Sequence, residues 1–572
     1  MAANCEPGEV LERLACTLRD ERECSLQIEP QRQLAEALVL WRLKRLGDAW
    51  ELLLSSLMEE AHANEPTYWI LRGMLARTQP DGSAQALRAY RQALVLDGSR
   101  ADLHYNLANL LREENPAAAE NAYCRSLQLD PQHSDCWHNF GAMLHGLERS
   151  TEARLSLQRS IQLDPNAANV WCDLGNVLVA LDDAHAAQRA FLLAISLDGM
   201  HGASHVNLGA ALVAGLEPQQ AITYLKRGVE LQQSSADALF NLALAHLHLG
   251  EFTAGWAYYD ARLSLTKDLG AGPPPTAGAM PESIEECPRG DDPPLVVWSE
   301  QGVGDGIHFC RYLALLEAAR IPFEFRAPLS LLPLYRDWLR LGDWVVPATK
   351  STDQTDQRPQ IPLLSLPRLF GTTVTTIPSQ LPYLHAPELP PDGLKVPEPP
   401  GGLAVGLVWA SHADNHKMYR RKSIPLTLLM PLFLTMLDLD LIDLHCLQCG
   451  VDEVQLQPWA QHERITSWAP QLTHFGDTAH VLNQLDLVIS VDTAVAHLAG
   501  ALGKPTWLLL PYSADFRWLQ QRQDSPWYPG SMRLYRQSAL GDWCSVVYQL
   551  QEAFNRLFLL DLDAVVSHTF ER

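Results

Sequence analysis

The stretch DLVISVDTAVAHLAGALGKPTWLLLP, residues 486–511, decides the fold of the C-terminal half of the chain. It contains an apolar run (LVISV), a polar turn (Asp492 and Thr493), a run of small residues (AVAHLAGALG) and a second apolar run (TWLLL). The apolar runs have the length and composition of strands, and the small-residue run, closed by Gly503, has the composition of a helix. Strand, turn, helix and strand form a βαβ unit, which predicts a parallel sheet.

The polar turn of this unit is the candidate ligand site. In open α/β sheets, ligands bind beyond the carboxyl ends of the strands. The unpaired N–H groups at a helix N-terminus also favour phosphate. Asp492, Thr493 and the amides that open the next helix, from Ala494 onward, occupy such a position. The alternative interpretation is a tightly packed βαβ unit whose turn binds nothing.

Length and charge limit the classes of protein to consider. A chain of 572 residues predicts several domains, and its net charge of −23 disfavours nucleic acids and anionic membrane surfaces as partners. The N-terminal residues MAANCEPGEV have neither the basic nor the apolar segment of a signal peptide. The longest apolar stretch, residues 424–437, is interrupted by two prolines and is too short to cross a bilayer. We therefore expect a cytoplasmic protein with no transmembrane segment and no nucleic-acid partner.

The eleven cysteines give no metal-site pattern. Cys446 and Cys449 form a single CxxC motif, and no second pair of ligands lies nearby in the sequence. A structural zinc site needs four ligands. We therefore expect no metal and no protein-bound cofactor.

The first half of the chain repeats itself every 34 residues. Residues of the same type recur at this interval at turns, at small positions and at large apolar positions. Internal periodicity of this length predicts a solenoid of helix pairs. The pattern resembles the tetratricopeptide repeat, and we expect the repeats over residues 31–268, preceded by a capping helix over residues 1–30. The recurring positions include Asp130, Asp164 and Asp198, Trp137 and Trp171, Gly141, Gly175 and Gly209, and Ala153, Ala187 and Ala221.

Asparagines recur near the middle of the first helix of each repeat. Solenoids of this kind present a concave groove suited to peptides, and an amide side chain can both donate to and accept from a peptide backbone. In the alternative interpretation, the asparagines bond neighbouring helices of the solenoid itself. The predicted groove residues are Asn106, Asn139, Asn176, Asn207 and Asn241.

A linker separates the repeats from a second fold. Residues 269–294 are dense in proline and glycine, which excludes a helix or a central strand. The run LVVW, residues 295–298, then predicts a strand, and residues 307–320 predict a helix. The turn between them has the glycine content of a phosphate-binding or close-approach turn, with carboxylates at its rim. Its residues of interest are Gly302, Gly304, Gly306, Glu300 and Asp305.

The remaining chain predicts two α/β lobes with a cleft between them. The first lobe covers residues 295–400. The second covers residues 401–545 and opens with the strand LAVGLVW, followed by a polar loop over residues 410–423. The last segment, residues 546–572, predicts an amphipathic helix. The fold class is therefore α + α/β, with a helical solenoid followed by two Rossmann-like lobes.

Four ordered motifs resemble the GT-B glycosyltransferases of the heptosyltransferase type, family 9. They are EQGVGDGIHFCRYL, GLVWASHADNHKMYRRKSIPL, DLVISVDTAVAHLAGALGKPTWLLLP and DFRWLQQRQDSPWYPGSMRLYRQ. The chain is similar to bacterial proteins that carry such a domain behind tetratricopeptide repeats, and more distantly to O-linked N-acetylglucosamine transferases.

This resemblance implies an inverting, metal-independent transfer from a nucleotide-diphosphate sugar. Cations and helix-end amides must stabilise the leaving diphosphate, and Arg420, Arg421 and Lys422 are the natural cations. Asp305 matches the carboxylate that the family uses as general base. The implied donor-binding residues are Gly302, Gly304, Trp409, Arg421, Lys422, Asp492, Thr493, Ala494 and His497.

Each of these assignments has a plainer alternative. Asp305 can cap the following helix, because Asp is a common capping residue. His497 can pack between helix and sheet, and the basic residues can form a solvated loop. Three further histidines lie near the motifs without an assigned role, namely His308, His412 and His416.

The predicted function is glycosyl transfer from a nucleotide sugar to a protein or glycan acceptor, which the solenoid helps to recruit. The alternative belongs to another class: a non-catalytic tetratricopeptide scaffold for protein–protein interaction that carries a degenerate transferase domain.

Overall fold

The computed structural model describes residues 29–54, 56–232, 235–265, 279–335, 344–347, 357–388, 393–397, 402–413 and 416–559. The capping helix predicted over residues 1–30 lies almost entirely outside the described residues, as does the first part of the linker. Two compact units divide the chain at Ser204 and His205, inside the repeat region.

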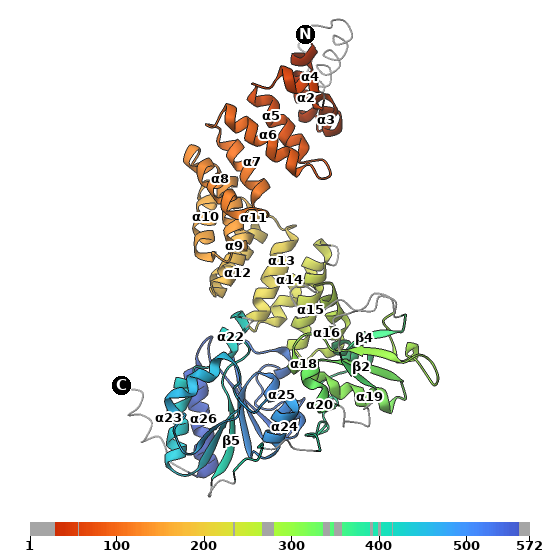
Figure 1. Cartoon of the computed structure of the whole chain (residues 1–572), viewed down its shortest axis with the longest axis vertical. Coiled ribbons are helices and arrows are strands. Elements are labelled where there is room, and N and C mark those ends of the chain that lie inside the picture. Colours follow the sequence, from red (N-terminus) through yellow and green to blue (C-terminus); the bar gives the residue numbers. More distant parts are fainter. Residues whose placement is uncertain are drawn as a thin grey trace. The chain divides into compact units, whose positions relative to one another are not determined.

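Antiparallel helix pairs make up the repeat region (Figure 1). The first unit contains α2 (Glu29–Arg42), α3 (Leu46–Leu53), α4 (Ser56–Ala61), α5 (Pro66–Ala76), α6 (Ser83–Leu96), α7 (Ala101–Leu111), α8 (Pro116–Leu129), α9 (Ser134–Gly146), α10 (Ser150–Leu163), α11 (Ala168–Ala180) and α12 (Ala184–Leu197). At and after the division follow α13 (Gly202–Ala214), α14 (Pro218–Leu231), α15 (Ala236–His248), α16 (Phe252–Tyr259) and the 3₁₀ helix η1 (Asp260–Leu265).

Glycine and a large residue meet where the two helices of a repeat cross. A Cβ atom on Gly175 would lie 2.4 Å from Phe191 Cε1, and one on Gly209 would lie 2.4 Å from Leu225 Cγ. Contacts this short leave no space for a side chain, which explains the recurring glycine. Ala187 and Ala221 are likewise fully buried in the partner helices. The predicted solenoid is therefore confirmed, together with the register of its small and large positions.

Two parallel sheets follow the repeats. The first has the strand order β3-β2-β1-β4 and the second β10-β9-β8-β5-β6-β7, and all strand pairs within them are parallel. This confirms the predicted pair of α/β lobes. The strands are β1 (Leu295–Trp298), β2 (Phe323–Ala327), β3 (Val345–Pro347), β4 (Gln360–Pro362), β5 (Leu403–Val408), β6 (Ile442–Cys446), β7 (Ile465–Ser467), β8 (Leu487–Val491), β9 (Thr506–Leu510) and β10 (Met532–Arg536).

In each sheet, successive strands are first added on one side of the starting strand and then on its other side. The boundary between the two series is the switch point of the sheet. In the first lobe it lies between β1 and β4, and in the second between β5 and β8. Ligands of open α/β sheets bind at such switch points, beyond the carboxyl ends of the strands. The stretch that opened the sequence analysis supplies β8, α25 and β9, so its polar turn lies at the second switch point.

Helices cover both faces of the second sheet (Figure 1). Val405 and Leu407 of β5 share a core with α23 and α26, whereas Ala404 and Val408 share a core with α24 and α25. A parallel sheet covered on both faces is buried throughout, which accounts for its continuous apolar strands. The helices of the lobes are α18 (Val303–Phe309), α19 (Leu313–Ala318), α20 (Leu332–Tyr335), α21 (Leu366–Leu369), α22 (His416–Lys422), α23 (Leu426–Asp438), α24 (Phe475–Asn483), α25 (Ala494–Ala501) and α26 (Trp543–Phe558).

Two sequence predictions need correction. The segment predicted as a polar loop over residues 410–423 contains the helix α22, because HKMYRRK has no helix breaker. The C-terminal helix α26 begins at Trp543, before the predicted position, because Asp542 accepts a hydrogen bond from Ser545 N at 3.1 Å and caps the helix there.

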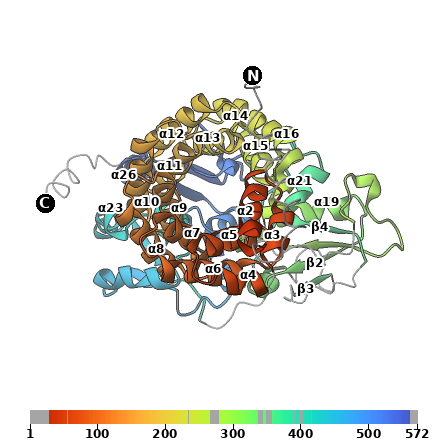
Figure 2. The same cartoon turned by 90° about the horizontal axis from the view of Figure 1, so that it is seen from above.

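The last helix of the repeats packs against both lobes. Phe252, Trp256 and Tyr259 of α16 form an aromatic cluster with Phe309 of the first lobe and with Phe516 and Trp527 of the second. Trp256 lies 6.2 Å from Phe309 and 5.7 Å from Phe516 between ring centroids. Helix α16 also contacts α21 of the first lobe (Figure 2). The end of the repeat region is therefore part of the core that holds the two lobes together.

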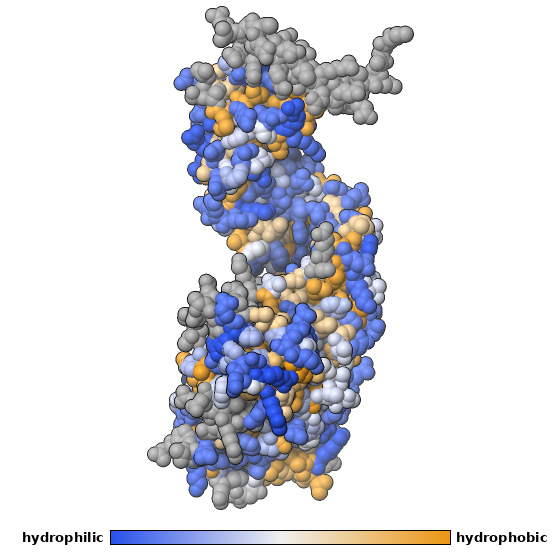
Figure 3. Space-filling view, turned by 90° about the vertical axis from the view of Figure 1, so that its right-hand side faces the viewer, coloured by the Kyte–Doolittle hydropathy of each residue, from blue (hydrophilic) through white to orange (hydrophobic). Residues whose placement is uncertain are grey.

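Hydrophilic residues predominate on the face of the molecule drawn in Figure 3, with apolar residues in small groups between them. Within the described residues, no helix combines the length and the apolar composition that crossing a bilayer requires.

Gly175→Ala tests the repeat packing. The added methyl group meets the Phe191 ring, so we expect the free energy of unfolding to fall by about 1–3 kcal/mol. The measurement is the thermal midpoint of the repeat transition. The matched control is Gly146→Ala, because a Cβ at that position meets nothing within 4 Å. Equal midpoints for the two variants would contradict this packing.

Candidate functional site

The turn after β8 opens helix α25. Thr493 is the N-cap of α25, and its side chain makes no capping bond within the helix. Thr493 Oγ1 instead lies 3.1 Å from Ser490 Oγ. The first N–H groups of an α-helix have no partner inside the helix. The N-terminal amides of α25 therefore lie at the second switch point, as predicted.

Helix α18 of the first lobe, which begins at Val303 within the predicted glycine-rich turn, packs against this helix end. A Cβ on Gly304 would lie 3.2 Å from His497 Cδ2 and 3.4 Å from Ala494 Cα. A side chain at position 304 would require its neighbours in α25 to move by a few tenths of an ångström. Gly304 therefore allows the two lobes to approach each other at the candidate site.

Asp305 faces the second lobe from α18. Its Oδ2 accepts a hydrogen bond from Gly302 N at 3.1 Å, and its Oδ1 forms an ion pair with Arg517 Nη2. Gly302, and not Asp305, is the N-cap of α18, but the Asp305 carboxylate in the first turn bonds back to the N-cap amide and so contributes to capping the helix. The same carboxylate also bridges the lobes. Burial raises the pKa of Asp305 above its ordinary value, although Arg517 opposes the shift.

Lys422 and Asp492 form a second ion pair, which spans the switch point between β5 and β8. Lys422 Nζ lies 2.6 Å from Asp492 Oδ2, and both side chains are largely buried. Burial by itself would raise the pKa of Asp492, but Lys422 holds it below its ordinary value. Arg421 donates from Nη2 to Ser513 O at 3.1 Å, and Arg420 is exposed.

His497 is buried and uncharged. Burial lowers the pKa of His497 to about 3. Its Nδ1 lies 3.0 Å from Tyr528 Oη, its ring stacks on Trp518 at 5.3 Å, and its Nε2 lies 3.8 Å from Asp492 Oδ1. The His497 ring is therefore packed in the interior, as the alternative interpretation stated. Because the ring is neutral, His497 can contribute a hydrogen bond to a ligand but not a charge.

Several residues of the site received no role from the sequence. Arg517 pairs with Asp515 at 2.8 Å as well as with Asp305, so a chain of charges joins the lobes. Tyr528 Oη lies 2.9 Å from His308 Nδ1, which gives His308 a buried position next to His497. The signal was present, because Asp515, Arg517 and Tyr528 all belong to the fourth motif that carries the resemblance.

Trp409 directly follows β5 at the second switch point, but its ring is buried in the core. Its side chain is completely buried in the core that includes α23, and its backbone N–H donates to Gln448 Oε1 at 3.2 Å. The ring offers no surface to a donor in this structure, so the direct contact expected from the resemblance is not seen. His412 is exposed, and the side chain of His416 lies outside the described residues.

Cys446 is buried and Cys449 is exposed, and both are free thiols. Among the residues that the structure describes, no three His, Cys, Asp or Glu side chains gather as a metal site would require.

Comparison with known proteins identifies both parts of the chain. Residues 447–514 match glycosyltransferase family 9 (heptosyltransferase). Residues 70–134, 168–199 and 206–264 match tetratricopeptide repeat models. The chain joins tetratricopeptide repeats to a glycosyltransferase family 9 domain. The family 9 match contains four of the candidate donor-binding residues, namely Asp492, Thr493, Ala494 and His497.

Solved structures resemble part of the chain. The crystal structure of MamA protein is 21% identical and covers 31% of this chain and 95% of its own, with a TM-score of 0.28. The pilF protein of Pseudomonas aeruginosa is 23% identical and covers 36% and 92%, with a TM-score of 0.31. YrrB, described as a tetratricopeptide protein with an unusual peptide-binding site, is 22% identical and covers 32% and 95%, with a TM-score of 0.28. No curated protein matches the chain.

The asparagines of the tetratricopeptide helices have partners within the solenoid. Asn139 donates from Nδ2 to Tyr105 Oη at 2.8 Å and to Asn109 Oδ1 at 3.0 Å. Asn241 donates to Asp237 O of its own helix at 2.9 Å. These bonds favour the alternative in which the asparagines stabilise the repeats, and peptide binding stays a prediction. The other positions are partly buried on the first helices of their pairs: Asn106, Asn176 and Asn207.

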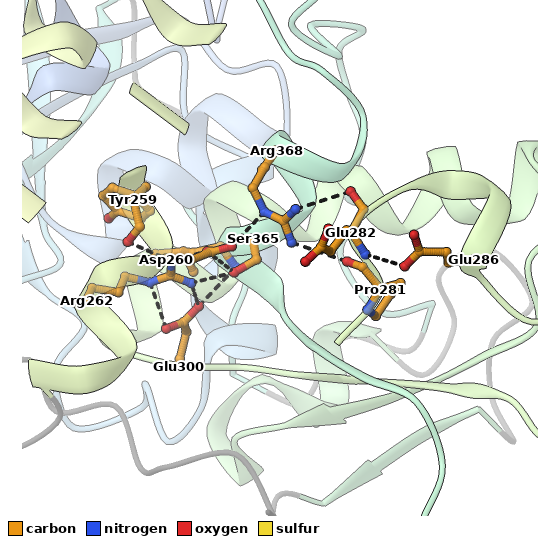
Figure 4. A network of polar contacts seen from close by, with 10 residues as sticks. Tyr259, Asp260, Arg262, Pro281, Glu282, Glu286, Glu300, Ser365 and Arg368 are labelled. Atoms are coloured by element: carbon orange, nitrogen blue, oxygen red, sulfur yellow. Dashed lines mark hydrogen bonds and ion pairs between the residues drawn. The ribbon is translucent and has the colours of Figure 1, made fainter. Parts of the chain in front are cut away.

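Glu300 is buried rather than at the rim of the glycine-rich turn. It lies at the switch point of the first lobe, where its carboxylate pairs with Arg262 of η1 and accepts from Leu364 N at 3.2 Å (Figure 4). Arg262 also donates to Asp260 Oδ1 at 2.8 Å and to Ser365 Oγ at 3.0 Å. The chain itself thus fills the switch point of the first lobe, because the end of the tetratricopeptide region inserts a buried arginine there.

Arg262→Met tests this buried network. The substitution leaves the Glu300 carboxylate buried without its main cation, so we expect a loss of about 3–5 kcal/mol in the free energy of unfolding. The double variant Arg262→Met/Glu300→Gln should recover part of the loss, because Glu300→Gln removes that buried charge. Urea titration followed by tryptophan fluorescence measures both.

The control for this series is Arg227→Met, which removes an exposed ion pair with Glu230 and should cost about 1 kcal/mol or less. If Arg262→Met unfolds at the same urea concentration as Arg227→Met, the network does not stabilise the fold as described.

Proposed function

We propose that this protein transfers a glycosyl group from a nucleotide-diphosphate sugar to an acceptor, with the diphosphate bound at the second switch point. The observation that supports this most is the meeting of three features there. Lys422 lies beside the N-terminal amides of α25, and Asp305 faces them from the other lobe. Of the two switch points, the first is filled by Arg262, which leaves the second for the donor.

The donor site has the chemistry that a diphosphate requires. Lys422 supplies a positive charge whose position Asp492 fixes, and the α25 amides supply hydrogen-bond donors along the helix dipole. Arg421 and Arg517 add cations on neighbouring elements. Positive groups placed where charge accumulates on the leaving diphosphate lower the barrier to its departure.

Asp305 is the proposed general base. The acceptor hydroxyl gives its proton to the Asp305 carboxylate while its oxygen forms a bond to the anomeric carbon. The bond from that carbon to the diphosphate oxygen breaks on the opposite face, and the diphosphate leaves with the electron pair. This displacement inverts the anomeric centre and uses no metal. The raised pKa of Asp305, caused by burial, makes its carboxylate a stronger base than an ordinary aspartate.

The tetratricopeptide repeats are the proposed acceptor-recruiting part. Solenoids of this type offer extended surfaces for protein partners. Because α16 packs against both lobes through its aromatic residues, an acceptor held on the last repeats is held at a fixed position relative to the second switch point.

The second candidate function is a scaffold with a non-catalytic transferase domain. One observation favours it: Asp305 and Lys422 are already paired with Arg517 and Asp492, so the charges of the site satisfy one another. The two candidates differ in donor binding and turnover, which the following variants measure.

Asp305→Asn tests the general base. The substitution keeps the shape of the side chain but removes its basicity, so we expect transfer or donor hydrolysis to fall by roughly 10²–10⁴-fold. Release of nucleoside diphosphate from a panel of nucleotide sugars is the readout. The control is Asp291→Asn, an exposed position directly before the same lobe, which should keep the wild-type rate.

The pH profile gives an independent check on the same residue. A base works when deprotonated, so the wild-type rate should fall about tenfold per pH unit below the Asp305 pKa, which burial places above that of an ordinary aspartate. Asp305→Asn should lose this limb. A variant with full rate and an unchanged profile would remove Asp305 from the mechanism.

Lys422→Met/Asp492→Asn tests the donor site without leaving an unpaired buried charge. Loss of a charged hydrogen bond to phosphate should weaken nucleoside diphosphate binding by roughly 10–100-fold in calorimetry. Arg533→Gln, which removes an exposed arginine of the same lobe with no role in the proposed donor site, is the control. Wild-type protein that binds none of the nucleoside diphosphates would instead support the scaffold.

A further inference from the structure

A cavity lies at the edge of the second sheet that β10 forms. Its volume is about 350 Å³, and its lining includes Leu216, His248, Tyr512, Gln520, Arg536 and Gln537. Arg536 ends β10, and Tyr512 follows β9, so the cavity lies beyond the carboxyl ends of these two strands. The proposed donor site lies at β5 and β8 instead. The cavity is therefore distinct from the proposed donor site and lies between the last repeats and the edge of the second lobe.

Arg536 brings a positive charge to this cavity without an acidic partner. Its Nη2 donates to Trp518 O and to Leu519 O, each at 2.6 Å, and its Nε donates to Arg522 O at 3.3 Å. Within the described part of the chain, no carboxylate forms an ion pair with Arg536. Burial lowers the pKa of Arg536 to about 10, so the guanidinium stays charged at neutral pH. A partly buried cation whose only partners among the described residues are carbonyl groups favours an anion nearby.

Two glutamine side chains add hydrogen-bond donors to the same cavity. Gln537 is 5% exposed, and its Oε1 accepts from Tyr512 N at 3.0 Å and from Gly541 N at 3.1 Å. Its Nε2 is buried and has no partner among the described residues, and the same holds for Gln520 Nε2. A buried donor without a partner costs free energy. Together with Arg536, these two amide N–H groups offer hydrogen-bond donors to an anionic ligand.

The loop over this cavity has a strained backbone. Leu519 and Gln521 have φ values of 47° and 58°, in the left-handed region that non-glycine residues seldom adopt. Arg536 holds the loop through the carbonyls at 518 and 519. Strain of this kind persists where the surrounding structure fixes it, and it clusters at ligand sites.

Neighbouring charges do not cancel that of Arg536. His248 is uncharged, because burial lowers its pKa below the ordinary value. Asp515 lies nearby on the segment after β9, but it is committed to Arg517 at 2.8 Å. The cavity therefore presents one uncompensated cation and two amide donors.

We propose that this cavity binds the anionic group, a carboxylate or a phosphate, of the acceptor substrate. The anion site follows from the cavity itself, whereas its assignment to the acceptor rests on the proposed glycosyl transfer. Two observations connect it with the acceptor. His248 and Leu216 bring the last repeats to its wall. Ala514 lines it directly beside Asp515, whose partner Arg517 holds Asp305.

The test is calorimetric titration of the full chain with inorganic phosphate and, separately, with malonate. The titrations are repeated in the Lys422→Met/Asp492→Asn background, so that the proposed donor site does not contribute. We expect saturable binding in that background. Tighter binding of phosphate indicates a phosphorylated acceptor, and tighter binding of malonate indicates a carboxylate.

Two variants locate the binding. Arg536→Gln removes the cation, and Gln520→Glu places a carboxylate in the cavity. Each should weaken anion binding at least tenfold, which is about 1.4 kcal/mol. Arg536→Gln can also change the conformation of the loop at residues 518 and 519, whereas Gln520→Glu changes the charge of the cavity and keeps Arg536 in place. The control is Arg533→Gln, which removes an exposed arginine of the same strand.

Wild-type anion affinity in both Arg536→Gln and Gln520→Glu, or no saturable binding of either anion, would overturn the proposal. Nucleoside diphosphate binding is measured in parallel and should be unchanged by both variants. If that binding is absent from the wild type while the anion site titrates as expected, the anion site stands and the proposed transferase function fails.

Discussion

The candidate site depends on opposite charges that are buried where the two lobes meet. Asp305 of the first lobe pairs with Arg517 of the second, and Lys422 pairs with Asp492 across the second switch point. Removing charges from water is costly unless they are paired. These pairs therefore fix the lobes and the side chains in one arrangement, and Gly304 lets the backbones come close enough to form it.

The end of the repeat region completes this arrangement. The aromatic residues of α16 contact both lobes, and Arg262 of η1 fills the switch point of the first lobe. Because the repeats contribute to the core of the lobes, the division of the chain into compact units falls within the repeats and not at the linker. The recruiting and the catalytic parts of the proposed enzyme thus share one core.

The sequence predicted the fold well because periodicity and strand composition are local signals. Small residues such as Gly175 and Ala187 recur at the same position of successive helix pairs, where the two helices cross. The apolar runs on either side of Asp492 have the composition of buried strands. It predicted the site only in part. The pairing of Asp305 with Arg517 joins residues far apart in the chain, and no local pattern reveals such a contact. The burial of Glu300 and of Trp409 follows from tertiary packing in the same way.

A crystal structure of the protein with a bound nucleoside diphosphate tests the central claim most directly. We expect the diphosphate oxygens to lie within hydrogen-bonding distance, about 2.7–3.2 Å, of Lys422 Nζ and of the first amide nitrogens of α25. A diphosphate bound elsewhere in the molecule, with Lys422 and the start of α25 free of it, would contradict the account.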